Sequence, residues 1–252
     1  MDFNQKTIKL LSTIGPRASF GMAALDLVKK YNDLMILTCD VSTSAGLDRY
    51  RKSFSENYID LGIAEQNLIG VATGLASEKF KVITTTFAPF QTMRCCEQIK
   101  VNLGYMKEKI TMVGLASGLV LGNLGYTHCC IEDVGVLRSI PNLTIISPSD
   151  SLETVKAIEA SLTHEQSCYI RITGGSNNPI VNEDDFDFKI GKGKLILKGE
   201  EILIIATGAS VSHAIKASLE LKKKNLNSSV INMSTIKPLD QEIIKNNLDE
   251  KV

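Results

Sequence analysis

Several features that commonly place a protein in a functional class are missing from this sequence of 252 residues. Its 28 lysines and arginines are balanced by 28 acidic residues, so no excess charge favours a nucleic acid or a membrane surface as partner. No apolar run approaches the roughly 20 residues that a membrane-spanning helix needs. Residues 1–6 lack the basic region and the apolar core of a signal peptide. These absences predict a globular protein of the cytoplasm.

Patterns that would indicate a disulfide framework or a metal site are absent as well. The six cysteines are Cys39, Cys95, Cys96, Cys129, Cys130 and Cys168. No two of them form a Cys-x-x-Cys pair, and in a reducing compartment we expect them to be small apolar fillers. The three histidines are too few for a histidine metal cluster. We therefore expect no metal ligand on this chain.

The sequence does contain a regular alternation of apolar, strand-like runs and helical patterns. Strands are expected over residues 34–40, 58–61, 81–86, 110–115, 143–147 and 168–172. Helices are expected over residues 19–30, 64–76, 89–103, 131–140 and 151–163. Ser149 or Asp150 is placed to cap the last of these helices, with Glu153 as its capping-box partner. The alternation predicts an α/β domain whose parallel sheet is covered on both faces.

This pattern breaks between residues 173 and 189, where Gly-Gly-Ser-Asn-Asn-Pro and an acidic run have the composition of a linker. We therefore place one domain at residues 1–180 and a second at residues 188–252. The second segment should contain a hairpin, a strand, a helix and another strand, over residues 188–198, 202–207, 211–223 and 230–233. With only about 60 residues, it should have a thin core.

The most informative stretch of the sequence is DLGIAEQN, residues 60–67. It places Glu65 at the step from a short strand to an apolar helix in which Gly70 and Gly74 allow another backbone to approach closely. A carboxylate at such a step can be a catalytic group. An acid in the first turn of a helix can also serve only to complement the helix dipole, and the stretch alone leaves both interpretations open.

Residues 60–67 resemble the motif that carries the catalytic glutamate of transketolases and 1-deoxyxylulose-5-phosphate synthases, enzymes that use thiamine diphosphate. Further blocks similar to this family follow in the family's order, namely TTTFAPF, GYTH, ED, LRSIPN and IISPSD, within residues 84–150. Such an ordered set is more specific than one short motif. The resemblance implies a thiamine-diphosphate-binding (pyrimidine) domain of the transketolase family, followed by a partial transketolase C-terminal α/β domain.

The resemblance also implies roles for individual residues. Glu65 corresponds to the carboxylate that hydrogen-bonds the N1′ atom of the cofactor's aminopyrimidine. Phe90 is expected to stack on that ring, and Phe87 either supports it or is ordinary core packing. His128 corresponds to the histidine that contacts the donor ketose near its C1 hydroxyl or carbonyl group. The predicted catalytic residues are therefore Glu65 and His128.

Contacts to the substrate are implied by a second set of residues. Asp40 and Ser44 match a family loop that reaches the cofactor and the substrate phosphate. Asp40 is the predicted cofactor contact of this loop, although it could simply cap the loop at the end of its strand. Arg17 could bind phosphate near the N-terminus. A family arginine after the last strand of the domain falls at Gly174, and Arg171 lies close to it in the sequence. We take Arg17, Ser44 and Arg171 as the candidate substrate ligands.

Two other polar positions of the family, a histidine and an aspartate, fall at Ala116 and Leu124. Neither side chain can bind a hydroxyl or phosphate group. Because a site that loses polar partners changes its specificity strongly, we expect ketol transfer with a phosphorylated or modified sugar.

The sequence contains no Gly-Asp-Gly motif, which in the family begins the site for the diphosphate and a divalent cation. Oxygen ligands for Mg²⁺ or Ca²⁺ would then come from another chain. The resemblance implies the C-terminal subunit of a split transketolase, whose N-terminal partner carries Gly-Asp-Gly. An α2β2 heterotetramer is expected, with the Gly70/Gly74 face as a candidate contact.

Alternative functions remain at this point. One is a subunit that resembles deoxyxylulose-phosphate synthase or that decarboxylates a 2-oxo acid. The other is a noncatalytic partner subunit, which the short C-terminal segment and the changed substrate positions favour. Retention of Glu65 together with Phe90 favours an enzyme.

Overall fold

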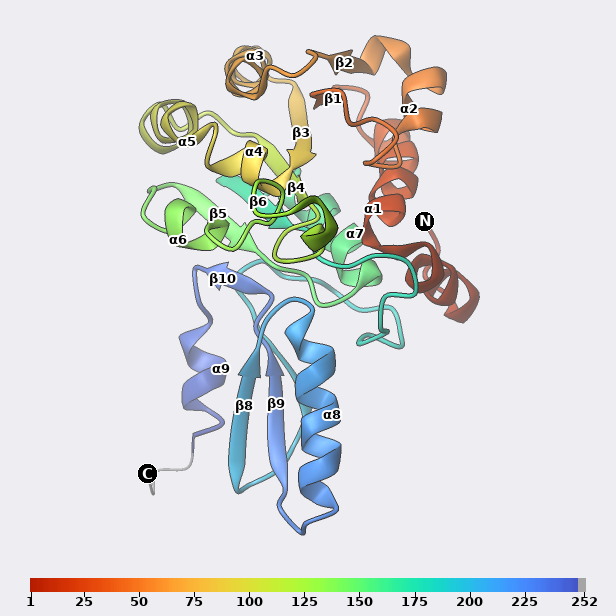
Figure 1. Cartoon of the computed structure of the whole chain (residues 1–252), viewed down its shortest axis with the longest axis vertical. Coiled ribbons are helices and arrows are strands. Elements are labelled where there is room, and N and C mark those ends of the chain that lie inside the picture. Colours follow the sequence, from red (N-terminus) through yellow and green to blue (C-terminus); the bar gives the residue numbers. More distant parts are fainter. Residues whose placement is uncertain (249–252) are drawn as a thin grey trace.

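The computed structural model describes residues 1–248 and contains two β-sheets, which lie one above the other along the longest axis of the molecule (Figure 1). The seven-stranded sheet and its helices form the upper part of the view, and a three-stranded sheet forms the lower part. In the part of the chain that the structure describes, no helix combines the length and apolar character that crossing a bilayer requires.

Six parallel strands make up most of the larger sheet, whose order is β10-β5-β6-β4-β3-β1-β2. These strands are β1 (Leu34–Thr38), β2 (Tyr58–Asp60), β3 (Lys81–Phe87), β4 (Thr111–Leu115), β5 (Leu143–Ile146) and β6 (Ser167–Arg171). All residues of β1, β4 and β5 are buried, as expected for strands covered on both faces. The mainly parallel α/β fold is thus confirmed.

Alternate side chains of the strands enter two hydrophobic clusters on opposite faces of this sheet. Ile83 and Val113 pack in one cluster, whereas their neighbours Val82 and Met112 pack in the other. The first cluster is covered by the packed pair α1 (Gln5–Lys30) and α7 (Ser151–Ser161). The second is covered by α3 (Glu65–Ser77), the π-helical segment η2 (Ile99–Tyr105) and α6 (Asp133–Leu137). The remaining short helices of this part are α2 (Asp48–Ser53), η1 (Ser55–Asn57), α4 (Ala88–Thr92), α5 (Cys96–Gln98) and η3 (Gly122–Leu124).

Two helices differ from their predicted extents. The helix predicted over residues 19–30 begins at Gln5 and bends at Gly15, whose φ of 82° departs from the helical region. The helix predicted over residues 131–140 is shorter, because only α6 is regular there.

The prediction of one helix over residues 89–103 is wrong, because α4 ends at Thr92 and α5 begins only at Cys96. The Thr92 hydroxyl donates to the Ala88 carbonyl at 2.7 Å, and the Cys95 thiol donates to the Phe90 carbonyl at 3.1 Å. Such side-chain bonds compete with the regular helical ladder. The interruption places Arg94 outside any helix.

The smaller sheet has the order β7-β9-β8, with β7 (Lys194–Leu197), β8 (Ile202–Ala206) and β9 (Ser228–Asn232). Helix α8 (Ser210–Lys222) packs on β8 and β9, and α9 (Gln241–Lys245) follows near the C-terminal end of the described chain. The hairpin predicted over residues 188–198 is wrong, because β7 pairs antiparallel with β9 instead. An apolar run predicts a strand, but it does not identify the partner strand.

The two sheets are joined by a strand and by a buried polar cluster. Strand β10 (Thr235–Lys237) follows β9 in the chain but pairs antiparallel with β5 of the larger sheet. Asp150 caps α7 by accepting from the Glu153 amide at 2.8 Å, which confirms the predicted cap. The Glu153 carboxylate accepts from the Ser149 amide and hydroxyl, both at 2.6 Å, and from Asn232 of β9 at 3.0 Å. Burial, together with the nearby Asp150 charge, raises the pKa of Glu153.

Candidate active site

Three aromatic side chains meet at the end of β3. Phe87 is the last residue of β3, Phe90 lies on α4, and His128 comes from the long loop between β4 and α6. The Phe87 and Phe90 ring centroids are 6.4 Å apart, and the His128 ring lies 6.1 Å from Phe87 and 5.4 Å from Phe90. All three pairs are edge-to-face, a geometry that aromatic rings prefer.

Glu65, the first residue of α3, joins this group through Arg94. Its side chain is only 4% exposed, and both carboxylate oxygens accept from Arg94 Nη1 at 2.8 Å. The Arg94 guanidinium also lies over the Phe90 ring, with Cζ 4.1 Å from the ring centroid. The structure therefore brings together Glu65, Phe90, Phe87 and His128, four residues that were predicted separately as contacts of the cofactor or the substrate.

Arg94 was not among the predicted site residues. The helix predicted over residues 89–103 includes it, and an arginine in a regular helix is most often a solvated surface residue. One signal was available, because Arg94 is the only cation between Lys81 and Lys100 and follows the Thr-Phe block closely.

Asp60 holds the turn that leads to Glu65. Its carboxylate accepts from the Gly62 amide at 2.9 Å, from the Asp40 amide at 3.0 Å and from the Thr38 hydroxyl at 3.1 Å. Burial alone would raise the pKa of Asp60, but these hydrogen bonds outweigh it and lower that pKa. Gly62 has a φ of 65°, a conformation that glycine adopts at no steric cost. The Asp40 side chain is exposed. Within this chain, Asp40 supports the site through its backbone amide, which donates to Asp60.

Arg17 and Ser44, two of the candidate substrate ligands, line one cavity. The cavity has a volume of about 180 Å³ and is also lined by Gly15, Gly174 and Gly175. The resemblance predicted a family arginine at Gly174, and among the residues that line this cavity Arg17 is the one cation. Its walls offer a guanidinium, a hydroxyl and glycine backbone, a set that suits an anionic group.

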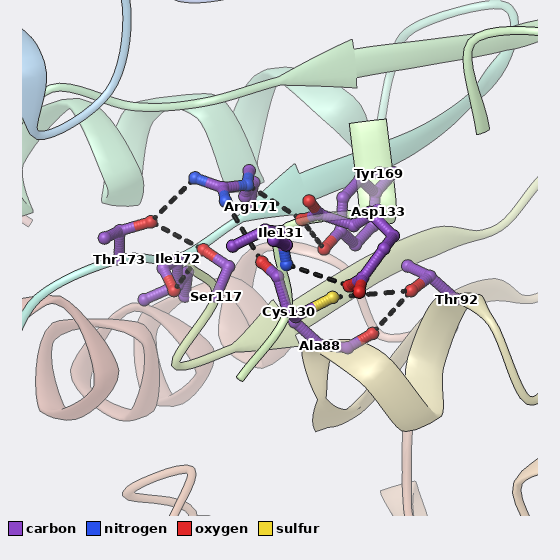
Figure 2. Close-up of polar contacts among 11 residues, drawn as sticks. Ala88, Thr92, Ser117, Cys130, Ile131, Asp133, Tyr169, Arg171, Ile172 and Thr173 are labelled. Atoms are coloured by element: carbon purple, nitrogen blue, oxygen red, sulfur yellow. Dashed lines mark hydrogen bonds and ion pairs between the residues drawn. The ribbon is translucent and has the colours of Figure 1, made fainter. Parts of the chain in front are cut away.

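Arg171 is not among the residues that line this cavity. It lies in a polar network with Asp133, Thr173 and Cys130 (Figure 2). Its Nε donates to Asp133 at 2.7 Å, its Nη1 to the Thr173 hydroxyl at 3.2 Å and its Nη2 to the Cys130 carbonyl at 3.3 Å. Asp133 is fully buried and also accepts from the Tyr169 hydroxyl at 2.8 Å. Burial raises the pKa of Tyr169 well above its ordinary value. This network fixes the base of the loop rather than facing the Arg17 cavity.

The His128 loop is also closed by backbone bonds. Gly118 and Cys130 form an antiparallel bridge, with nitrogen–oxygen distances of 2.7 Å and 2.8 Å. Beyond the bridge the loop exposes large apolar side chains, among them Leu119, Leu124 and Tyr126, the last of which is 81% exposed. Loops with apolar surface of this kind commonly meet another protein.

The predicted contact face of α3 can also be placed. Nothing lies within 4 Å of a Cβ built on Gly70 or Gly74, so that face of α3 is open to a partner. Within residues 1–248, no group of three or more His, Cys, Asp or Glu side chains is arranged to hold a metal ion.

Comparison with known proteins identifies two families along the chain. The family model described as "Transketolase, pyrimidine binding domain" matches residues 12–177. The model described as "Transketolase, C-terminal domain" matches residues 191–251. The first match covers well over half of the chain and includes every predicted site residue.

Curated relatives and a solved structure agree with these matches. A "Putative transketolase C-terminal section" of Methanocaldococcus jannaschii is 36% identical over 93% of this chain and 75% of its own length. A protein of Phocaeicola vulgatus, named as one subunit of an apulose-4-phosphate transketolase, is 34% identical over 94% of this chain and 76% of its own. A structure described as "Split gene transketolase, inactive beta4 tetramer" superposes with a TM-score of 0.85 at 29% identity, over 93% of this chain and 75% of that one. The chain therefore belongs to the transketolase family and matches both its pyrimidine-binding domain and its C-terminal domain.

Proposed function

We propose that this chain is the C-terminal subunit of a split, thiamine-diphosphate-dependent transketolase, which transfers a two-carbon ketol unit from a ketose phosphate to an aldose. The observation that carries the proposal is the convergence of Glu65, Phe90 and His128, from three separate segments, on one place. The similarity to a protein named as one subunit of an apulose-4-phosphate transketolase supports both the reaction type and the division into separate chains.

The residues at this place fit the aminopyrimidine ring of the cofactor. The Arg94 guanidinium, a planar group with N–H donors, already stacks on Phe90 and donates to Glu65. The aminopyrimidine ring is also planar and would use the same two side chains. When bound, thiamine diphosphate supplies the nucleophilic carbon that adds to a ketose carbonyl. Glu65 would hold a proton at N1′, and Phe90, supported by Phe87, would orient the ring. His128 would donate to the ketose oxygen on which negative charge develops.

For the substrate, the proposal assigns the phosphate group to the Arg17 and Ser44 cavity. A guanidinium binds phosphate oxygens through strong, charge-assisted hydrogen bonds. Ala116 is buried and Leu124 is exposed, and neither can bond a sugar hydroxyl. The proposed substrate is therefore a phosphorylated or modified ketose with fewer polar contacts along its chain.

For the assembly, we propose that an N-terminal partner subunit carries the Gly-Asp-Gly site for Mg²⁺ or Ca²⁺ and that two copies of each chain form an α2β2 heterotetramer in the cytoplasm. The open glycine face of α3 and the apolar His128 loop support a large contact with another chain. The related split-gene transketolase structure is described as an "inactive beta4 tetramer", and this description supports a need for the partner subunit. In this proposal the chain divides into domains at residues 1–180 and 188–252.

The test is a ketol-transfer assay with this chain and a Gly-Asp-Gly partner chain from the same genome, with thiamine diphosphate and Mg²⁺. Activity on a panel of ketose phosphates should require both chains. Glu65→Gln should lower kcat by about 10²- to 10⁴-fold, the usual range for a group that handles a proton in the transition state. Glu242→Gln, in the exposed first turn of α9, is the matched control and should keep full activity.

The same assay separates the alternatives. Release of CO₂ from pyruvate, without ketol transfer, would identify a subunit that decarboxylates a 2-oxo acid. A folded complex that binds thiamine diphosphate but turns over neither the ketose phosphates nor pyruvate would indicate a noncatalytic subunit.

A further inference from the structure

Arg94 has no role in the proposed reaction, yet its side chain lies at the centre of the site. It makes two contacts there, an ion pair with Glu65 at 2.8 Å and a stack on Phe90 at 4.1 Å. These are the two residues to which the proposed function assigns the aminopyrimidine ring. The guanidinium also shares the ring's relevant properties, since it is flat, presents N–H donors and stacks on aromatic faces.

The guanidinium and the ring cannot use these contacts together. One face of Phe90 accepts a single flat group at stacking distance, and Arg94 covers it at 4.1 Å. Both oxygens of the Glu65 carboxylate accept from the same Arg94 nitrogen. While this pair holds, Arg94 occupies the carboxylate that the proposed function assigns to N1′.

The surroundings allow Arg94 to leave without disturbing the fold. Its side chain is 42% exposed, whereas that of Glu65 is 4% exposed. Its backbone is held separately, because Gln66 Nε2 donates to the Arg94 carbonyl at 3.2 Å. Rotation of the side chain alone would therefore open the face of Phe90 and move the guanidinium into water.

We propose that Arg94 occupies the pyrimidine position in the cofactor-free chain and is displaced when thiamine diphosphate binds. This inference rests on the proposed function. Arg94 keeps the buried Glu65 carboxylate paired until the cofactor arrives, and it competes with the cofactor for Glu65 and Phe90. With such competition, the apparent dissociation constant for the cofactor equals the intrinsic one divided by the fraction of chains whose site is open.

The test is isothermal titration of thiamine diphosphate, with Mg²⁺ present, into the two-chain complex that contains wild type, Arg94→Met or Arg94→Lys. If Arg94 fills the site in about nine chains of ten, Arg94→Met should bind the cofactor about tenfold more tightly. Arg94→Lys should show a smaller gain, because an ammonium group can pair with Glu65 but cannot stack as a flat donor. Arg138→Met, which removes an exposed arginine after α6, is the matched control and should bind like wild type.

A thermal unfolding measurement on the cofactor-free chain distinguishes this role from a structural one. Arg94→Met should lower the Tm of the free chain, because Glu65 loses its partner, and yet should raise cofactor affinity. A lower Tm with weaker or unchanged binding would overturn the inference while leaving the proposed function in place. Absence of cofactor binding by the wild-type complex would overturn both.

Discussion

Two arginine–carboxylate pairs lie near the same end of the large sheet's parallel strands and differ mainly in how exposed the arginine is. The Glu65–Arg94 and Asp133–Arg171 pairs have nearly equal nitrogen–oxygen distances, 2.8 Å and 2.7 Å. Both carboxylates are buried, but the Arg94 side chain is 42% exposed and that of Arg171 only 19%. Because the pair distances are alike, we base the expectation that one pair exchanges and the other persists on the exposure of the cation.

The position of each arginine in the fold explains this difference. Arg171 is the last residue of β6, and its guanidinium also bonds Thr173 and the Cys130 carbonyl. Arg94 lies in the interruption between α4 and α5, and within residues 1–248 its guanidinium contacts only Glu65 by hydrogen bond. We therefore expect Asp133–Arg171 to support the His128 loop and Glu65–Arg94 to open.

The largest effect should come from Asp133→Ala. It leaves Arg171 inside the protein without its carboxylate, and breaking one side of a buried ion pair costs about 3–5 kcal/mol. The free energy of unfolding, measured with urea, should fall by that amount. Glu220→Ala, which breaks the exposed pair with Lys223, is the control and should cost no more than about 0.5 kcal/mol. Equal losses in the two variants would contradict the comparison.

Arg94→Met should have a smaller effect on the cofactor-free chain, about 1–3 kcal/mol, because it leaves the buried Glu65 carboxylate without its donor. The same urea measurement applies. Arg171→Met is the matched comparison and should cost more, since it removes three hydrogen bonds around Asp133, Thr173 and Cys130. A larger loss for Arg94→Met would reverse the proposed roles of the two pairs.

Glu65→Gln should cost less than about 1 kcal/mol in the cofactor-free chain, because the released Arg94 side chain can turn into water. Asp133→Asn is the comparison and should cost more, because it leaves the Arg171 guanidinium inside the protein without a carboxylate partner. Stability close to wild type for Glu65→Gln would also show that any loss of activity in the complex is chemical. A loss as large as that of Asp133→Asn would mean that Arg94 is not free to move.

The smallest effect concerns Glu153, a buried carboxylate whose hydrogen-bond partners are neutral groups. Its pKa in the folded chain is raised above the unfolded value, which is about 4.3. Its contribution to stability is therefore full below that unfolded pKa and is lost as the pH rises through the folded pKa. Relative to Glu153→Gln, wild type should lose stability as the pH rises above about 4.3.

Urea unfolding at a series of pH values measures this difference. Glu200→Gln, which removes an exposed carboxylate from the same chain, controls for the change in net charge. A gap between wild type and Glu153→Gln that stays constant with pH would show that Asn232 and Ser149 compensate fully for the burial of the charge.

Local patterns in the sequence predicted much of the fold and the centre of the site. The parallel strands follow from apolar runs, and Glu65, Phe90 and His128 follow from motifs whose order matches the transketolase family. The pairing of β7 with β9 and the insertion of β10 beside β5 were not predicted, because they join segments distant in the chain. Arg94 was missed for a related reason. Its importance depends on an interruption between α4 and α5 and on contacts with Glu65, a residue of another helix.

By itself the sequence determined where most of the strands and helices lie, which family the chain resembles and which carboxylate stands at the start of α3. These properties depend on the order of neighbouring residues, whose spacing sets the period of each element and the identity of each motif. Only the tertiary structure decided that Arg171 supports a loop and that Arg94 lies on Phe90. An arginine side chain is long and flexible, and the groups that surround it after folding select its partner and its exposure.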